Sequence, residues 1–145
     1  ETRRNSVSYR NNMERLARKL LLEGQNEKAE EILDLAMEKM PVHKFGHYSM
    51  LISFIDIYYS LEKKEKARLL IEQLKPVLQE KLRYYSQFND TRIEDVFNEI
   101  ERSLRMYDQI VKIGSRFDDE KYAAELKTEY VFYLKLFDFL IEDEL

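Results

Sequence analysis

MERLARKLLLEGQNEKAEEILDLAMEKMP, residues 13–41, is the stretch that decides the fold of this chain. Apolar residues recur at helical spacing on both sides of Gly24, namely Met13, Leu16, Ala17 and Leu20 before it and Ala29, Ile32, Leu33, Ala36 and Met40 after it. Gly24 can take a positive φ and end the first helix, and Asn26 can cap the second. Pro41 cannot continue a hydrogen-bonded helix, so it stops the second one. The stretch therefore predicts an α-helical hairpin with small residues where its helices approach.

This hairpin resembles a tetratricopeptide repeat, a helix–turn–helix unit of about 34 residues. With Arg10 as position one, the residues that match the family pattern are Leu16, Ala17, Gly24, Ala29, Ala36 and Pro41. Met13 and Leu20 stand where the family usually has Trp and Tyr. The resemblance implies a right-handed array of stacked hairpins rather than a particular activity.

The composition favours an all-α fold. Of the 145 residues, 44% are hydrophobic and 36% are charged, while Gly and Pro number only 3 and 2. All-β folds and glycine-rich phosphate loops need more of these two residues. The net charge of −4 argues against a nucleic-acid partner, and the absence of cysteine excludes disulfides and thiolate metal sites.

We expect about six helices in one helical-repeat domain, residues 9–145, after a linker or frayed segment, residues 1–8. The three hairpins are predicted at residues 9–41, 45–88 and 91–142. The second one resembles a degraded repeat at an offset of 38 residues. Tyr58 and Ala67 fit the pattern, whereas Ile55, Glu62 and Leu74 stand where the family has small residues or the turn glycine. Pro76 predicts a kink near residues 72–76 or two helices in series.

The third hairpin has longer helices with a coiled-coil period. Its apolar positions are Ile93, Phe97, Ile100, Leu104, Tyr107 and Val111, followed by Ala123, Leu126, Tyr130, Tyr133, Phe137 and Leu140. We expect Thr91 and Glu94 to form a capping box, Gly114 to end the first helix, and Asp118 to cap the second.

The chain begins with Glu1 and not with Met, so we expect it to be a piece of a longer protein. No apolar run reaches the roughly 20 residues that cross a bilayer, so we predict no membrane insertion by this piece. The order EGQNEKAEEILDLAMEKMP (23–41), IDIYYSLEKKEKARLL (55–70) and KLRYYSQF (81–88) is similar to the helical tail of certain bacterial membrane proteins. Their multi-spanning part is protein O-mannosyltransferase-like. That resemblance implies tethering to a bacterial membrane through the upstream chain, and the compartment stays open.

No motif predicts catalysis, a metal site or a cofactor. His43 and His47 have the spacing of two metal ligands on one helix face, but a third ligand is missing and Lys44 follows the first histidine. We interpret them as surface histidines. The acidic run 118–120 fits helix capping better than acid–base catalysis. The basic N-terminal residues Arg3, Arg4, Arg10, Arg15, Arg18 and Lys19 fit a solvated helix face better than a nucleic-acid or membrane patch.

Two surfaces are candidates for binding a protein or peptide. In a tetratricopeptide-like array the first helix of each hairpin lines the groove, which here gives Asn11, Glu14, Arg18, Ser49, Ile52, Asp56 and Tyr59. Glu14 and Arg18 replace the Lys and Asn with which family members clamp a C-terminal carboxylate, so a different peptide is expected.

The second surface lies in YVFYLKLFDFLI, residues 130–141, where Phe132, Leu136 and Phe139 point away from the predicted helix seam. Either the second hairpin covers them, or they contact a second copy, the membrane domain of the same protein, or another protein. The expected function is a non-catalytic interaction or scaffold module. The alternative is the soluble accessory tail of a membrane-embedded glycosyltransferase-like enzyme whose active site lies outside this chain.

Overall fold

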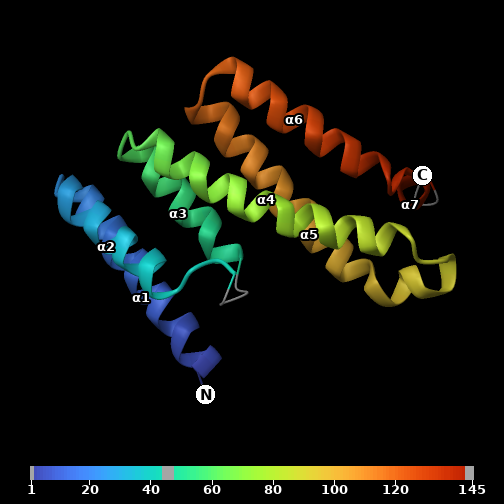
Figure 1. Ribbon diagram of the computed structural model, residues 1–145, viewed down its shortest axis with the longest axis horizontal. Helices are drawn as coiled ribbons and strands as arrows, with labels where there is room; N and C mark the ends of the chain where they lie inside the picture. The colour runs from blue at the N-terminus through green and yellow to red at the C-terminus, as the bar shows by residue number, and fades with distance from the viewer. Residues whose placement is uncertain (1, 44–47, 143–145) are drawn as a thin grey trace. The chain divides into compact units, whose positions relative to one another are not determined.

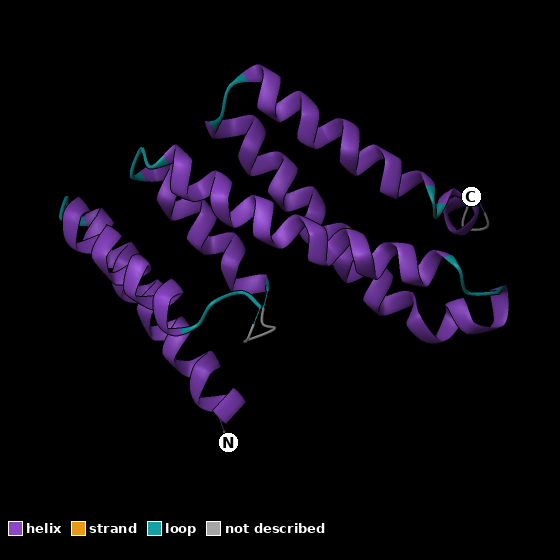
Figure 2. Ribbon diagram, viewed as in Figure 1, coloured by secondary structure: helices purple, strands orange, loops and turns teal. Residues whose placement is uncertain are grey.

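The computed structural model describes residues 2–43 and 48–142, and all regular structure in these ranges is α-helical (Figures 1 and 2). The helices are α1 (Thr2–Leu22), α2 (Asn26–Lys39), α3 (Ser49–Ser60), α4 (Lys64–Ser86), α5 (Asp90–Phe117), α6 (Glu120–Lys135) and α7 (Asp138–Glu142). The prediction of an all-α chain is confirmed. α1 begins at Thr2, well before the expected start near residue 9.

The chain divides into two compact units, residues 1–74 and 75–145, where the sequence predicted one domain over 9–145. The boundary lies within α4, just before Pro76. α4 continues through this proline as one helix, so the alternative of two helices in series is wrong. Unit 1 contains α1, α2, α3 and the first part of α4, and unit 2 contains the rest of α4 with α5, α6 and α7.

In unit 1 the chain reverses after α1 through a left-handed residue, as predicted. Gly24 has a φ of 75°. Its N–H donates to the carbonyl of Leu21 (3.1 Å), and the N–H of Gln25 donates to the carbonyl of Leu20 (2.8 Å). This pair of bonds is a Schellman motif, which satisfies carbonyls that the helix end leaves open. α2 begins at Asn26 after the N-cap Gln25, whose side chain makes no capping bond, so the prediction of Asn26 as the cap is wrong.

The same reversal recurs 38 residues later, between α3 and α4. Glu62, with a φ of 60°, takes the place of Gly24. Its N–H donates to the carbonyl of Tyr59 (3.0 Å), and the N–H of Lys63 donates to the carbonyl of Tyr58 (2.9 Å). The two hairpins of unit 1 therefore turn in the same way although only one of them has a glycine.

Small side chains lie at the helix contacts of unit 1. α1 packs against both α2 and α3. Ala17, Ala29, Ala36 and Ala67 are fully buried. Leu16, which the helical pattern placed with the core residues, is 42% exposed, because the buried strip of α1 is narrower than the apolar pattern suggested.

In unit 2, α5 and α6 form an antiparallel hairpin (Figure 1). The sequence predicted that Gly114 ends α5, but this prediction is wrong, because α5 continues through Gly114 to Phe117. A Cβ at this position would come within 2.7 Å of Leu126 Cδ1, so the absence of a side chain permits the close approach of α6. The buried face of α5 also includes Ser103 and Ile110, which the predicted seam did not contain.

The caps of unit 2 differ from the predicted ones by one or two residues. Asn89, and not Thr91, caps α5 through a bond from the N–H of Arg92 to its Oδ1 (3.1 Å). Asp119, and not Asp118, caps α6 by accepting from the N–H of Tyr122 (2.9 Å). Both capping side chains are nonetheless of the type that N-caps favour.

The last predicted helix is interrupted. α6 ends at Lys135, and a tight turn with bonds from the N–H of Leu136 to the carbonyl of Tyr133 and from the N–H of Phe137 to the carbonyl of Leu134 precedes α7. Phe137 is buried in this turn. No glycine or proline marks the break, and the helical pattern through Leu140 gave no sign of it.

Within the described ranges, no helix combines the length and the apolar character needed to cross a membrane.

The left-handed conformation of Glu62 gives a test of the turn between α3 and α4. A residue with a Cβ pays about 1–2 kcal/mol for this conformation, whereas glycine adopts it freely. We expect Glu62→Gly to raise the free energy of unfolding by about 0.5–1 kcal/mol after the added chain entropy of glycine is subtracted. Urea unfolding followed by circular dichroism measures the change.

Glu65→Gly, in the first turn of α4, is the matched control and should lower the free energy of unfolding by up to about 1 kcal/mol. If Glu62→Gly lowers it as well, the turn does not hold a left-handed residue at position 62.

Candidate functional site

The predicted groove residues of unit 1 fall into three groups. Arg18 links α1 to α3. Its Nε lies 2.8 Å from Glu14 Oε1 on α1, and its NH1 lies 3.5 Å from Asp56 Oδ2 on α3. Asn11 and Ser49 are exposed. Ile52 and Tyr59 are buried, so they support this surface from below and do not line it. The structure thus brings together Glu14, Arg18 and Asp56, three of the residues assigned to the groove from the sequence.

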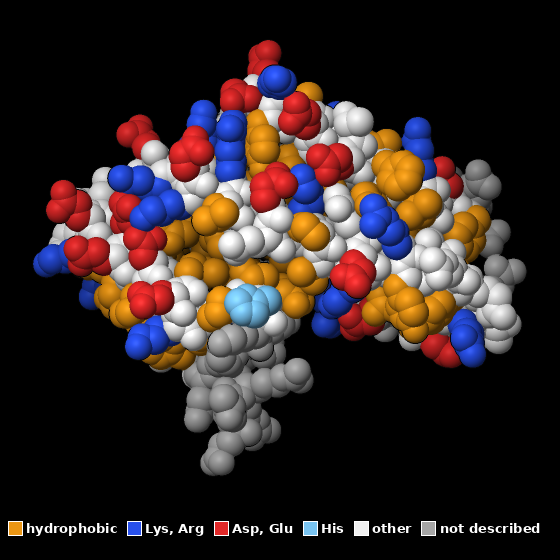
Figure 3. Space-filling view, viewed as in Figure 1, with side chains coloured by type: hydrophobic (Ala, Val, Ile, Leu, Met, Phe, Trp, Pro, Cys, Tyr) orange, Lys and Arg blue, Asp and Glu red, His pale blue; other side chains and the backbone are white. Residues whose placement is uncertain are grey.

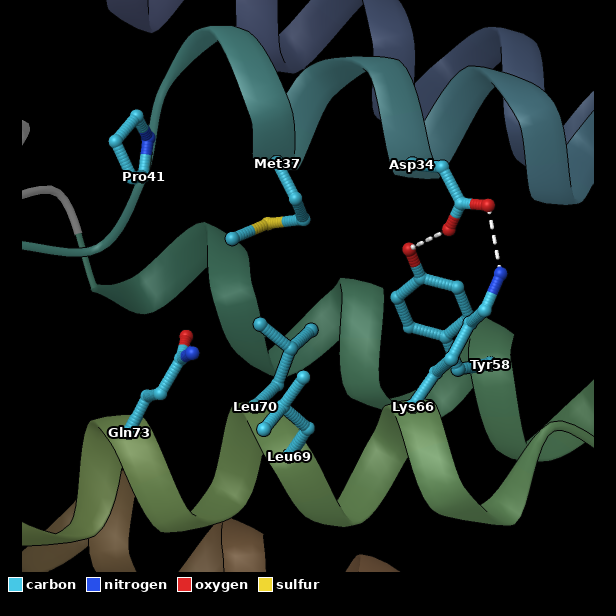
Figure 4. A pocket seen from close by; sticks show the side chains of 8 residues that line it. All are labelled: Asp34, Met37, Pro41, Tyr58, Lys66, Leu69, Leu70 and Gln73. Atoms are coloured by element: carbon cyan, nitrogen blue, oxygen red, sulfur yellow. Dashed lines mark hydrogen bonds and ion pairs between the residues drawn. The ribbon is translucent and has the colours of Figure 1, made fainter.

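A cavity of about 310 Å³ lies between α2, α3 and α4 of the same unit, and the sequence did not predict it. Figure 4 shows its lining. The apolar part consists of Met37, Pro41, Leu69 and Leu70, and the polar part consists of Asp34, Tyr58, Lys66 and Gln73. Leu69 is 60% exposed, so the cavity opens to solvent beside an apolar side chain.

A clamp of charged and polar side chains closes one end of this cavity (Figure 4). Lys66 Nζ donates to Asp34 Oδ2 and to Glu30 Oε1, each at 2.6 Å. Tyr58 Oη donates to Asp34 Oδ1 at 2.7 Å. Lys63 Nζ lies 3.2 Å from Glu30 Oε2. The clamp therefore links α2, α3 and α4.

The electrostatics of this clamp fit a structural role better than acid–base chemistry. The hydrogen bonds from Lys66 lower the pKa of Glu30, and those to Asp34 and Glu30 raise the pKa of Lys66. Burial, together with the bond to Asp34, raises the pKa of Tyr58. A general acid or base needs a pKa near the working pH, and each of these groups moves away from neutrality.

A second set of polar contacts holds α4 to α5 and α6 within unit 2. Lys75, Gln79 and Arg83 follow one another at four-residue spacing on one face of α4. The Lys75 ammonium lies 3.1 Å from Glu129 Oε2, and Gln79 Nε2 donates to Tyr107 Oη (2.9 Å). These contacts, with the 2.6 Å bond from Arg83 NH2 to Tyr133 Oη, are interhelical and serve packing.

The predicted apolar face is only partly on one helix. Phe132 lies on α6 and is 59% exposed. Leu136 forms the C-cap of α6 and Phe139 belongs to α7, so the prediction of three residues along one helix is wrong because α6 ends at Lys135. Hydrophobic side chains also reach the surface between charged ones on the face drawn in Figure 3.

One residue of the predicted basic surface is buried. Arg10 has a relative exposure of 1%, and its NH2 donates to the carbonyl of Met40 at 2.7 Å. Met40 is the C-cap of α2, where the helix dipole favours a positive charge. Burial lowers the pKa of Arg10. Arg10 thus fastens α1 to the end of α2 and is not part of a solvated face.

Of the two histidines considered as metal ligands, His43 is exposed, and His47 lies outside the described residues. In the part of the chain that the structure describes, no group of three or more histidine, aspartate and glutamate side chains has an arrangement that could hold a metal ion. Asp118 Oδ1 accepts from the N–H of Asp119 at 2.8 Å, which is a turn contact.

A scan against protein-family models and searches of curated proteins and of solved structures found no match to this chain.

The clamp predicts a pH dependence of stability. Because the pKa of Glu30 in the folded chain lies below its ordinary value of 4.5, the ion pairs stabilise the fold above that value and lose their effect as the pH falls. We expect Glu30→Gln to lower stability at neutral pH and to flatten the loss of stability between about pH 5 and about pH 3.

Urea unfolding at a series of pH values measures this dependence. Glu31→Gln removes the same charge from the same helix at an exposed position. It should leave the slope of the unfolding free energy against pH close to that of the unmodified chain. Equal slopes for all three proteins would show that Glu30 is not held by cations in solution.

The buried guanidinium predicts a large effect of truncation. Arg10→Ala removes the charged donor of the hydrogen bond to the Met40 carbonyl and leaves a cavity, so we expect a loss of about 2–4 kcal/mol in the free energy of unfolding. Arg15→Ala, on the exposed side of α1, should change it by less than about 0.5 kcal/mol. Similar small effects of both changes would place Arg10 at the surface.

Proposed function

We propose that this chain is a non-catalytic protein-interaction module with a right-handed, tetratricopeptide-repeat-like arrangement, carried by a larger bacterial protein as a scaffold. Its partner binds as a peptide segment across the surface that α1 and α3 form. The observation that carries the proposal is the contact between Arg18 and Asp56, the facing side chains of these two helices.

The equivalence of the two hairpins supports this proposal. The turns at Gly24 and Glu62 make the same pair of backbone bonds, and α1 packs against α3, the first helix of the next hairpin. Stacking of successive first helices is the way in which helical repeats build extended binding surfaces.

The side chains at this surface suit a polar ligand segment. Glu14 and Asp56 flank Arg18, so the row presents carboxylates on both sides of one cation. Exposed Asn11 and Ser49 lie on the same two helices and can donate and accept hydrogen bonds. A peptide with basic and hydrogen-bonding groups matches this row better than a C-terminal carboxylate does.

Site-specific photo-crosslinking in the source organism tests the proposal. A photoreactive phenylalanine analogue replaces Asn11 or Ser49 in the complete protein, and Lys28, exposed on α2, is the control position. We expect one discrete adduct with a separate protein from positions 11 and 49 and none from position 28. Arg18→Glu should reduce the adduct yield, whereas Glu31→Arg, a charge reversal on α2, should not.

Two outcomes contradict the proposal. Adducts of equal yield from all three positions indicate unspecific contact. An adduct formed only within the same polypeptide contradicts the scaffold function. It favours the alternative, an accessory tail that docks on the protein's own membrane-embedded part.

A further inference from the structure

The outward face of α6 has two adjoining surface hollows of about 390 Å³ each. One is lined by Lys127, Thr128, Val131, Phe132 and Lys135, and the other by Lys121, Ala124, Glu125, Thr128 and Glu129. Thr128 belongs to both. At 100° per residue, the lining residues span an arc of about 200° on the helix, from Lys127 at one edge to Glu129 at the other.

The shape of this face suits a second helix. Ala124, Thr128 and Phe132 follow one another at four-residue spacing along α6, so two small side chains and one large side chain lie in one row. Rows at this spacing are the ridges and grooves through which helices pack against each other. Phe132 is 59% exposed and lies next to the half-buried Val131 in the sequence. It is the kind of aromatic side chain on which the affinity of an interface often depends.

The charge of this face is opposite to that of the whole chain. Lys121, Lys127 and Lys135 stand on it against Glu125 and Glu129, and Glu129 is ion-paired with Lys75, while the chain has a net charge of −4. Among the described residues, none of these lysines makes an ion pair, in contrast to Lys63, Lys66 and Lys75. The apolar hollow therefore has cations at both ends for which the described residues provide no ion-pair partner.

We propose that the outward face of α6 binds an amphipathic α-helix of a partner protein whose apolar stripe is flanked by aspartate and glutamate. The apolar side chains of that helix contact Phe132 and Val131, and its carboxylates meet Lys127 and Lys135. The inference rests on the proposed function as an interaction module but uses another surface and another ligand. An anionic membrane fits less well, since one exposed phenylalanine offers little insertion and the net charge of −4 is repelled.

Fluorescence anisotropy with synthetic helices tests the inference on the 145-residue chain. One labelled peptide of roughly 18 residues, about 27 Å long as a helix, carries a leucine stripe flanked by glutamate, and a second carries the same stripe flanked by lysine. We expect the glutamate peptide to bind at least about tenfold more tightly and to weaken as salt rises. The double change Lys127→Glu with Lys135→Glu should reverse this preference.

Matched variants separate the site from general effects. Phe132→Ser should weaken binding of the glutamate peptide at least about tenfold, which is the range of an interface anchor. Leu69→Ser removes an equally exposed side chain from unit 1, and Lys28→Glu with Lys39→Glu makes the same charge change on α2, so both should leave binding unchanged. Circular dichroism of each variant confirms that it is folded.

Three results would overturn the inference: equal binding of both peptides, an unchanged preference after the charge reversal at positions 127 and 135, or binding to vesicles with phosphatidylserine that exceeds binding to the glutamate peptide. None of these depends on the surface of α1 and α3. If the peptide-binding test on α6 fails but positions 11 and 49 still give position-specific crosslinks, the proposed function stands and only the inference about α6 is wrong.

Discussion

A left-handed residue two positions after the end of the first helix of each hairpin is the constraint on which unit 1 depends. Gly24 and Glu62 reverse the chain within a few residues, because the Schellman bonds pair the last carbonyls of α1 and α3 with the next N–H groups. A tight reversal fixes which faces of the two helices meet. The fully buried alanines, among them Ala17 and Ala29, can then bring the backbones close without a gap.

Polar side chains that reach between helices select the neighbours that the small residues allow. In unit 1, Arg10 fixes α1 to the end of α2, and Lys66 ties α4 to α2. In unit 2, Lys75 and Gln79 make the corresponding links from α4 to α6 and α5. Such contacts add modest stability, but a misaligned packing would leave these groups without partners and so costs more. They specify one arrangement of otherwise similar amphipathic helices.

Sequence patterns predicted what depends on the chain near each residue. Gly24, the all-α fold and the 38-residue offset between the hairpins follow from local spacing and turn chemistry, and the structure has each of them. The roles of Gly114 and Arg10 were not predictable in this way, because a helix neighbour distant in sequence decides them. The sequence assigned Glu14, Arg18 and Asp56 to one groove, yet it could not show that they form ion pairs or that Ile52 and Tyr59 are buried. The clamp around Lys66 joins three helices and has no local signature.

Exposure by itself does not identify a binding surface in this chain, and charge decides between two equally exposed apolar side chains. Leu69 and Phe132 have nearly the same exposure, 60% and 59%. Beside Leu69, the cation Lys66 is already held by Glu30 and Asp34, so a charged partner would compete with contacts that link three helices. Beside Phe132, Lys127 and Lys135 make no such contacts in the described chain. A ligand with carboxylates gains apolar and Coulomb contacts there without breaking any, which favours α6 over the cavity of unit 1 as the place where an acidic helix binds.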